Sequence, residues 1–242
     1  MLIDNKHLCN HDKRLSCSNC RLSSLCLPIS LELDELDQVS DVILRNQPLH
    51  KGDYLYRGGS TFSSIFAVRS GSVKSVYISE EGSEQITGFY LPGEILGMDG
   101  LDNNTYRNSA IALETSSICE IPFNKIEALN QQIPSLQRHL FQLMGREITN
   151  DQQLISLLTK GSSEQRITTL LLSLSSRNHR RQLSSIEFLL PMSRTDLGNY
   201  LGLTIETVSR VFSRLQKQGI IHTERRLVSI LEFDELKSIA AG

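Results

Sequence analysis

The stretch MSRTDLGNYLGLTIETVSRVFSRLQKQGII, residues 192–221, contains two short helical patterns separated by a turn at Gly202 and Leu203. Ser193 and Thr204 stand where a helix N-cap is expected. Because Gly198 carries no side chain, the two helices can approach closely at that point. Five apolar residues would hold them at an angle: Leu197, Leu201, Val208, Phe212 and Leu215. This pattern predicts a helix-turn-helix.

The second of these helices presents Glu206, Ser209 and Arg210 on one outward face, at spacings of three and four. In a DNA major groove, Arg donates two hydrogen bonds to guanine, Glu accepts one from cytosine, and Ser adapts to several bases. Three nearby residues are expected to meet phosphates, which fix register without reading sequence: Thr207, Arg214 and Lys217. The alternative is an ordinary helical hairpin with a charged surface.

Two further features support a DNA-binding domain over residues 161–242. After Gly219, the stretch IIHTERRLVSILEF reads as two short strands around a basic turn at Arg225 and Arg226, a wing that could contact the DNA backbone. Residues 163–242 carry 11 Lys and Arg against 8 Asp and Glu, whereas the rest of the chain is net negative. A solvated basic surface would explain the charge alone, but together with the motif it predicts a winged helix.

Residues 31–133 have a different texture. The stretch SIFAVRSGSVKSVYISEEGSEQITGFYLPGEILG, residues 64–97, alternates short runs of Val, Ile, Phe and Tyr with turn residues. Nine of the fifteen glycines lie between Gly52 and Gly100, at the spacing of antiparallel hairpins. We therefore predict a β-roll or jelly roll that serves as a sensor domain, and an α+β fold overall.

Residues 134–160 predict one long helix, which begins at Pro134, a favourable residue for the first helical position. Its apolar residues step by threes and fours, and Asp151 fills a gap in the series: Leu136, Leu140, Met144, Ile148, Ile155 and Leu158. A core helix of the same domain is one reading. The favoured reading is a coiled coil between two subunits, in which the two Asp151 carboxylates repel each other and make dimerisation marginal.

The N-terminal segment, residues 1–30, is too short to form a core and carries the cluster CSNCRLSSLC, with Cys17, Cys20 and Cys26. With no secretory signal and no apolar run of membrane length, a cytoplasmic location is expected, where thiols stay reduced. The cysteines then indicate metal binding or redox chemistry. Zinc, with His7 or His11, and a metal-free thiol sensor are the alternatives; Cys9 lies outside the pattern and receives no ligand role.

The segments KGDYLYRGGS, IFAVRSGSVK and LPGEILG, followed by the long helix and LGNYLGLTIETVSRVFSRLQKQGII, resemble the CRP/FNR family of transcription regulators over nearly the whole chain. Three further segments resemble its oxygen-responsive FNR branch: CSNCRLSSLCLPISL, EQITGFYLPGEILGMDGL and ALETSSICEIPF.

This resemblance implies a 4Fe-4S cluster held by four cysteines: Cys17, Cys20, Cys26 and Cys119. It also implies a homodimer that forms when the cluster is intact and binds palindromic double-stranded DNA with TTGAT-type half-sites to control anaerobic genes. RNA polymerase is the implied partner, through loops such as Ser79 to Glu84. Ser83 departs from the acidic residue of close relatives, which puts that contact in question.

The sequence leaves two other functions to consider. A cyclic-nucleotide receptor of the same fold would use Gly93 and Glu94 for the sugar, but its adjacent Arg-Ser phosphate pair is missing, since Asn108 separates Arg107 from Ser109. An iron-sulfur enzyme lacks support, because no catalytic motif or catalytic residue is recognisable. The chain is therefore expected not to be an enzyme.

Overall fold

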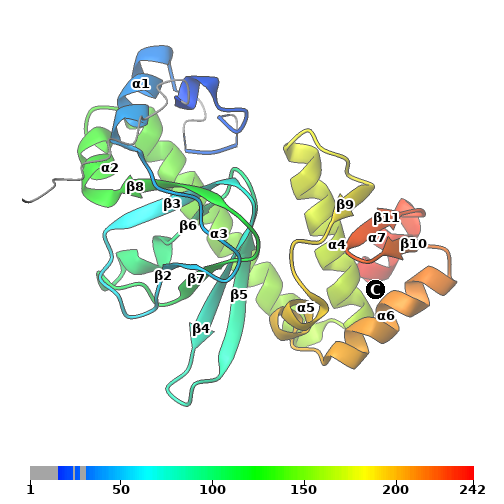
Figure 1. Ribbon diagram of the computed structural model, residues 1–242. Coiled ribbons are helices and arrows are strands. Elements are labelled where there is room, and N and C mark those ends of the chain that lie inside the picture. Colours follow the sequence, from blue (N-terminus) through cyan, green and yellow to red (C-terminus); the bar gives the residue numbers. More distant parts are fainter. Residues whose placement is uncertain (1–15, 24, 28–30) are drawn as a thin grey trace, which may run out of the picture.

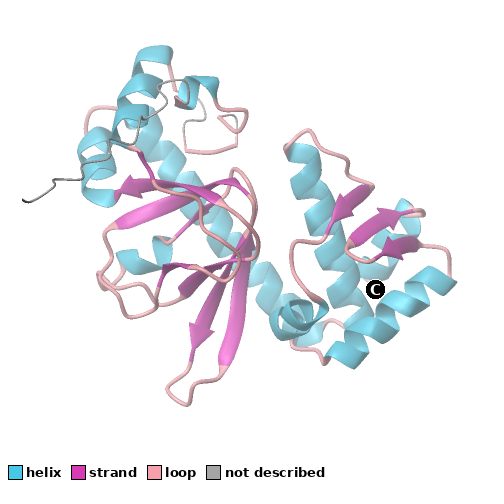
Figure 2. Ribbon diagram, viewed as in Figure 1, coloured by secondary structure: helices cyan, strands magenta, loops and turns pink. Residues whose placement is uncertain are grey.

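Two four-stranded antiparallel sheets form the roll in the N-terminal half of the chain (Figures 1 and 2). The computed structural model describes residues 16–23, 25–27 and 31–242. The strand orders are β1-β8-β3-β6 and β2-β7-β4-β5. The strands are β1 Leu44–Arg45, β2 Tyr54–Tyr56, β3 Ser64–Ser70, β4 Val73–Ile78, β5 Glu84–Tyr90, β6 Ile95–Leu96, β7 Ser109–Ala112 and β8 Ser117–Pro122. The predicted jelly roll is confirmed.

Side chains from both sheets fill the space between them, including Tyr56, Phe66, Val73 and Ile118. This packing explains the alternation in the sequence, since every second residue of a strand points inward. Gly71, between β3 and β4, shows why glycine is needed in these turns. Its φ is +79°, and a Cβ there would lie 2.5 Å from the backbone oxygen of Thr115.

Three helices pack on one end and one side of the roll (Figure 1): α1 Leu33–Val42, α2 Phe123–Asn130 and α3 Pro134–Lys160. The long helix α3 has the predicted bounds and begins at Pro134. A short 3-10 helix, Cys17–Asn19, lies next to α1, and another, Met98–Leu101, follows β6. The sequence did not indicate α1. This helix begins with reciprocal capping between Glu32, its N-cap, and Glu35. Among the described residues, no helix has the length and apolar character needed to cross a bilayer.

The C-terminal domain consists of α4 Ser163–Arg180, β9 Glu187–Leu189, α5 Arg194–Leu201, α6 Ile205–Lys217, β10 Ile221–Glu224, β11 Leu227–Ile230 and α7 Phe233–Ala241. Its small sheet has the order β10-β11-β9. The two predicted wing strands are present as β10 and β11. The third strand, β9, was not expected from the sequence.

The helix-turn-helix has the predicted local structure. The Ser193 hydroxyl accepts a hydrogen bond from the Asp196 N–H at 3.0 Å, and the Thr204 hydroxyl accepts one from the Thr207 N–H at 3.2 Å. A Cβ on Gly198 would lie 2.6 Å from a backbone oxygen of the turn, so close packing requires glycine there. The five predicted apolar residues are buried.

The roll and the C-terminal domain share one apolar core. Val76, Ile86 and Phe89 of the β4–β5 hairpin belong to the same buried group as Leu197 and Leu201 of α5. The C-terminal domain therefore rests on the hairpin of its own chain, an arrangement visible in Figure 1.

Candidate DNA-recognition face and cysteine site

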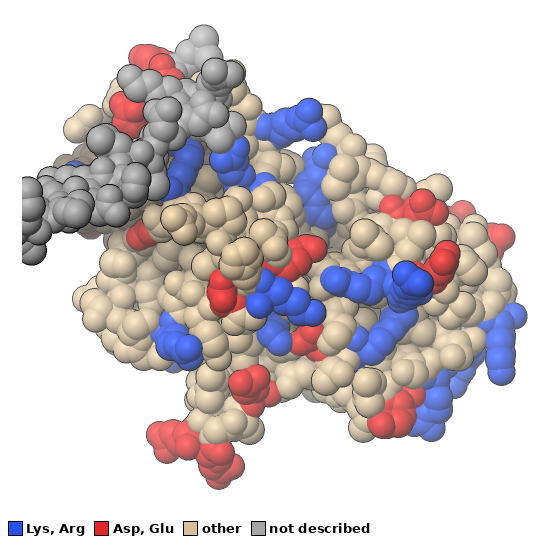
Figure 3. Space-filling view, in the orientation of Figure 1, with Lys and Arg blue, Asp and Glu red and all other residues tan. Residues whose placement is uncertain are grey.

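Helix α6 has one buried and one exposed face. Val208, Val211, Phe212 and Leu215 point into the domain. The three predicted base-reading residues are exposed together on the outer face: Glu206, Ser209 and Arg210. Figure 3 shows Lys and Arg side chains along the lower right edge of the molecule, where Figure 1 places α6. This face has the shape and charge to enter a major groove.

The predicted phosphate contacts are not equivalent in the structure. Thr207 is half-buried and accepts a hydrogen bond from the Arg210 guanidinium at 3.1 Å. Arg214 forms an ion pair with Glu164 of α4 at 3.1 Å, whereas Lys217 is exposed with no ion pair among the described residues. Hydrogen bonds from the backbone at the helix N-terminus and from Thr204 lower the pKa of Glu206, so this carboxyl is ionised as a hydrogen-bond acceptor.

One of the two predicted wing arginines is used inside the protein. The Arg226 guanidinium donates to the Leu190 backbone oxygen at 2.7 Å and to that of Pro191, which ties the wing to the segment before α5. Arg225 stands at the tip of the turn with φ of +53° and is exposed. Of the pair, only Arg226 has its guanidinium hydrogen-bonded to the backbone of the segment before α5 among the described residues.

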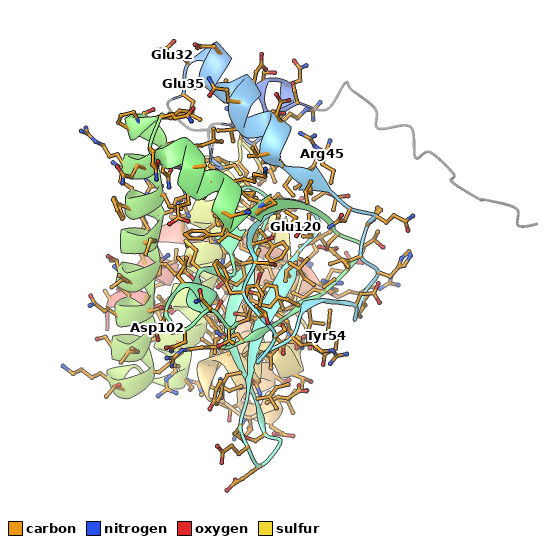
Figure 4. All side chains as sticks on the ribbon, turned by 90° about the vertical axis from the view of Figure 1, so that its left-hand side faces the viewer. Glu32, Glu35, Arg45, Tyr54, Asp102 and Glu120 are labelled. Atoms are coloured by element: carbon orange, nitrogen blue, oxygen red, sulfur yellow. The ribbon has the colours of Figure 1, made fainter. Side chains whose placement is uncertain are left out.

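Cysteines from distant parts of the chain meet at the end of the roll nearest α1. Cys17 is 8% exposed, and its N–H donates to the Ser40 hydroxyl of α1 at 3.3 Å. Cys119 lies in β8, opposite Arg45 of β1. Both belong, with Cys26, to one apolar group that also holds Leu136 and Leu140 of α3. Figure 4 shows Arg45 below α1 at this edge of the roll.

The four thiols act on one another electrostatically. The pKa of Cys26 is raised to about 12, mainly by burial and to a smaller extent by the other three cysteines. The pKa of Cys17 is raised mainly by burial and next by Cys119. Cys20 raises the pKa of both Cys17 and Cys119 to a smaller extent. Three of the four predicted ligands, Cys17, Cys26 and Cys119, pack in one apolar group, although they come from a loop and a strand about 90 positions apart.

Positive charge lies beside these sulfurs. Burial is the main influence on Cys119 and raises its pKa, whereas Arg45 and Arg69 act in the opposite direction; Arg45 also acts on Cys17. The sequence did not single out these arginines, because their place depends on strand register. They would stabilise thiolates, the form in which cysteine binds metals.

The described cysteines do not form a compact site for a single metal ion. Within residues 16–23, 25–27 and 31–242, no three His, Cys, Asp or Glu side chains are close enough to share one metal ion. Cysteine thiolates are the usual ligands of iron-sulfur clusters, whereas a structural zinc ion takes four tetrahedral ligands. The zinc reading with His7 or His11, and Cys9, falls outside the described residues.

The exposed stripe of α3 differs from the predicted one. Leu136 and Leu140 are buried in the core of their own domain, so the expectation that Leu140 faces a partner is wrong. Met144 and Leu158 are half-buried, and Asp151 is exposed. Phe141, Ile148 and Ile155 are 62%, 57% and 63% exposed at spacings of seven. Phe141 could have been found from this heptad spacing.

The two charged residues considered for a cyclic nucleotide are paired within the protein. The Glu94 carboxylate receives the Arg177 guanidinium of α4, with the Arg177 Nε at 2.7 Å from Glu94 Oε1. Arg107 pairs with Asp102 at 2.7 Å on the surface. The structure thus agrees with reading Gly93 and Glu94 as residues of the fold.

Comparisons with known proteins agree with these two domains. The model of the Crp-like helix-turn-helix domain matches residues 165–239, and that of the cyclic nucleotide-binding domain matches residues 46–132. The chain is 49% identical to the transcriptional activator protein anr of Pseudomonas aeruginosa, over 93% of each chain. It is 42% identical to the fumarate and nitrate reduction regulatory protein of Salmonella typhimurium, over 93% of this chain and 90% of the relative.

Among solved structures, FixK2 from Bradyrhizobium japonicum matches with a TM-score of 0.74 and 27% identity, covering 82% of this chain and 98% of FixK2. The match to each of the two sequence relatives covers 93% of this chain. The chain therefore belongs to the CRP/FNR family of transcription regulators and is of the FNR type.

Proposed function

We propose that this chain is an oxygen-responsive activator that holds a 4Fe-4S cluster through Cys17, Cys20, Cys26 and Cys119 and binds DNA as a homodimer. Its family and its helix-turn-helix make it a DNA-binding transcription regulator. The observation that carries the finer proposal is the meeting of Cys119 in β8 with the N-terminal cysteines. When bound, the cluster would supply an oxygen-labile iron core that keeps these sulfurs together.

The residues around the sulfurs would fix the N-terminal segment onto α3. Cys17 and Cys26 share their apolar surroundings with Leu136 and Leu140. His139, one turn along, is also buried, and Cys26 packs against the same apolar group as Leu136 and Leu140, so the cysteine loop lies against the helix. A loop that leaves its place would expose this part of α3.

The exposed stripe of α3 would carry the dimer contact. Phe141, Ile148 and Ile155 form an apolar surface that a second copy can bury, and Asp151 lies beside it. Partial burial of its carboxyl raises the pKa of Asp151 in a single chain, and a second copy packed on α3 would desolvate it further. Repulsion between two such carboxylates would keep pairing weak unless the helices are well aligned.

Two copies of α6 would then contact one palindromic site. Glu206, Ser209 and Arg210 suit TTGAT-type half-sites, in line with the family resemblance. The loop from Ser79 to Glu84 at the tip of the β4–β5 hairpin is exposed and would contact RNA polymerase. The protein would act in the cytoplasm and would have no enzymatic activity.

The test is anaerobic purification followed by iron and acid-labile sulfide assays, with the visible spectrum recorded as air is admitted. Wild type and Cys9→Ser should hold about four iron atoms per chain and lose them in air. Cys119→Ser should be iron-poor from the start. Equal iron and sulfide in Cys119→Ser and Cys9→Ser would refute the proposed ligand set.

A further inference from the structure

The turn at Gly93 and Glu94 lies between the cysteine loop and the C-terminal domain. On one side, a Cβ on Gly93 would lie 3.1 Å from the Leu25 Cβ and 3.8 Å from the Leu22 Cδ2. Both leucines belong to the loop between Cys20 and Cys26. The loop therefore touches the backbone of this turn directly. The φ of +90° at Gly93 favours glycine, so no side chain separates the turn from the loop.

On the other side, the same turn holds the C-terminal domain through Arg177. The Arg177 guanidinium makes two contacts with the Glu94 carboxylate and donates to the Phe89 backbone oxygen at 2.6 Å. The Leu91 N–H also donates to Glu94, at 2.9 Å. The Arg177 side chain is 14% exposed. Its burial alone would lower its pKa, but the Glu94 carboxylate outweighs that effect and raises it. This pair is thus strongly coupled.

A second set of contacts fixes α5 on the β4–β5 hairpin. The Asn199 side chain donates to the Glu84 oxygen at 2.8 Å and accepts from the Ile86 N–H at 2.5 Å. Lys74 pairs with Asp196 at 2.7 Å in a half-buried position. Because α5 is the first helix of the helix-turn-helix, these contacts determine where α6 stands relative to the roll.

We infer that the Gly93–Glu94 turn links the cysteine loop to the C-terminal domain within one chain, with Arg177 as the positioning residue for the DNA-binding face. This link would control DNA binding by a second route beside dimerisation. The inference that the cysteine loop responds to the state of a cluster rests on the proposed function. A seated loop supports the turn, the turn presents Glu94, and Glu94 holds Arg177. A palindromic site requires both α6 helices at fixed places, so a loosened domain binds it less well.

The test uses the Arg177→Gln variant. Arg107→Gln is the matched control, because Arg107 forms a solvent-exposed ion pair with Asp102 of the same domain. Iron content and the sedimentation of the anaerobic dimer should be unchanged in both. Affinity for a palindromic site should fall about tenfold in Arg177→Gln only. Amide exchange of residues 194–201 should be faster, and Arg177→Lys should restore part of the affinity.

A double-mutant cycle with Leu25→Ala tests whether the loop and Arg177 act through one route. In iron-loaded dimers, the double variant should bind DNA no worse than Arg177→Gln alone. Independent, additive losses would overturn the inference, and so would an affinity of Arg177→Gln within about twofold of wild type. Iron-poor wild type would instead refute the proposed function. In that case, unchanged exchange in α5 of iron-free Arg177→Gln would still overturn the positioning role.

Discussion

Truncation of Ile155 should weaken dimerisation strongly while leaving the single chain nearly as stable. Full burial of an Ile side chain contributes about 1.5–3 kcal/mol. Because Ile155 is 63% exposed in one chain, more than half of that contribution remains available to a partner. A symmetric interface counts the change twice, so Ile155→Ala should cost the dimer about 2–4 kcal/mol, or at least about 30-fold in its dissociation constant.

Sedimentation of the anaerobic protein over a concentration series would measure that constant, and urea unfolding of the monomer would measure stability. Leu136→Ala is the matched control, since Leu136 is fully buried in its own domain and its loss should cost about 2–5 kcal/mol of unfolding free energy. The reasoning is refuted if Ile155→Ala destabilises the monomer as much as Leu136→Ala and leaves the dimerisation constant unchanged.

Three further outcomes are expected. Asp151→Ala removes the repulsion across the seam and should give dimers that bind DNA in air; aerobic monomers in sedimentation would contradict this. Arg210→Ala should cost about 1–3 kcal/mol on the specific site and much less on random DNA, measured by titration of both; equal losses would make Arg210 a phosphate contact. Burial raises the pKa of Glu147 above its value in the unfolded chain. The neutral carboxyl therefore stabilises the fold fully at pH values below the unfolded pKa, and this contribution is lost as the pH rises through the folded pKa. Glu147→Gln keeps an oxygen that can accept the Tyr90 hydroxyl, so it should raise the melting temperature at pH 7.5 and not at pH 4. An equal effect at both pH values would exclude titration of Glu147 as the cause.

Local signals were sufficient for the helix-turn-helix and the start of α3. Ser193, Thr204 and Pro134 act within one turn of their own position, so their roles can be read without the fold. The roll was predictable because alternation and turn glycines recur along the strands. Strand β9, by contrast, has three residues and exists through long-range pairing of Phe188 with Val228.

The exposed apolar stripe of α3 was only partly predictable, for a geometric reason. Steps of four residues advance by about 40° around a helix, so the series from Leu136 to Ile148 turns by about 120°. The predicted stripe therefore begins in the roll's own core and ends in solvent. Steps of seven drift much less, which is why Phe141, Ile148 and Ile155 share one face.

Arg45 and Arg69 could not be assigned to the cysteine site from the sequence alone. Arg45 faces Cys119 through the register of β1 on β8, and neither residue lies within 20 positions of its partner sulfur along the chain. Likewise, the pairing of Glu94 with Arg177 joins residues of two domains. Such charges become visible only when the sheets and helices are in place.

The cysteine segment has no core of its own, and Leu27, fully buried, occupies a hollow formed by residues that arrive much later in the chain, such as Ile126. Removal of Leu27 from that hollow would expose apolar surface to water and make this part of the chain more susceptible to proteolysis. Under the proposed function, loss of the cluster would therefore shorten the lifetime of the polypeptide in the cell as well as lower its occupancy of promoters.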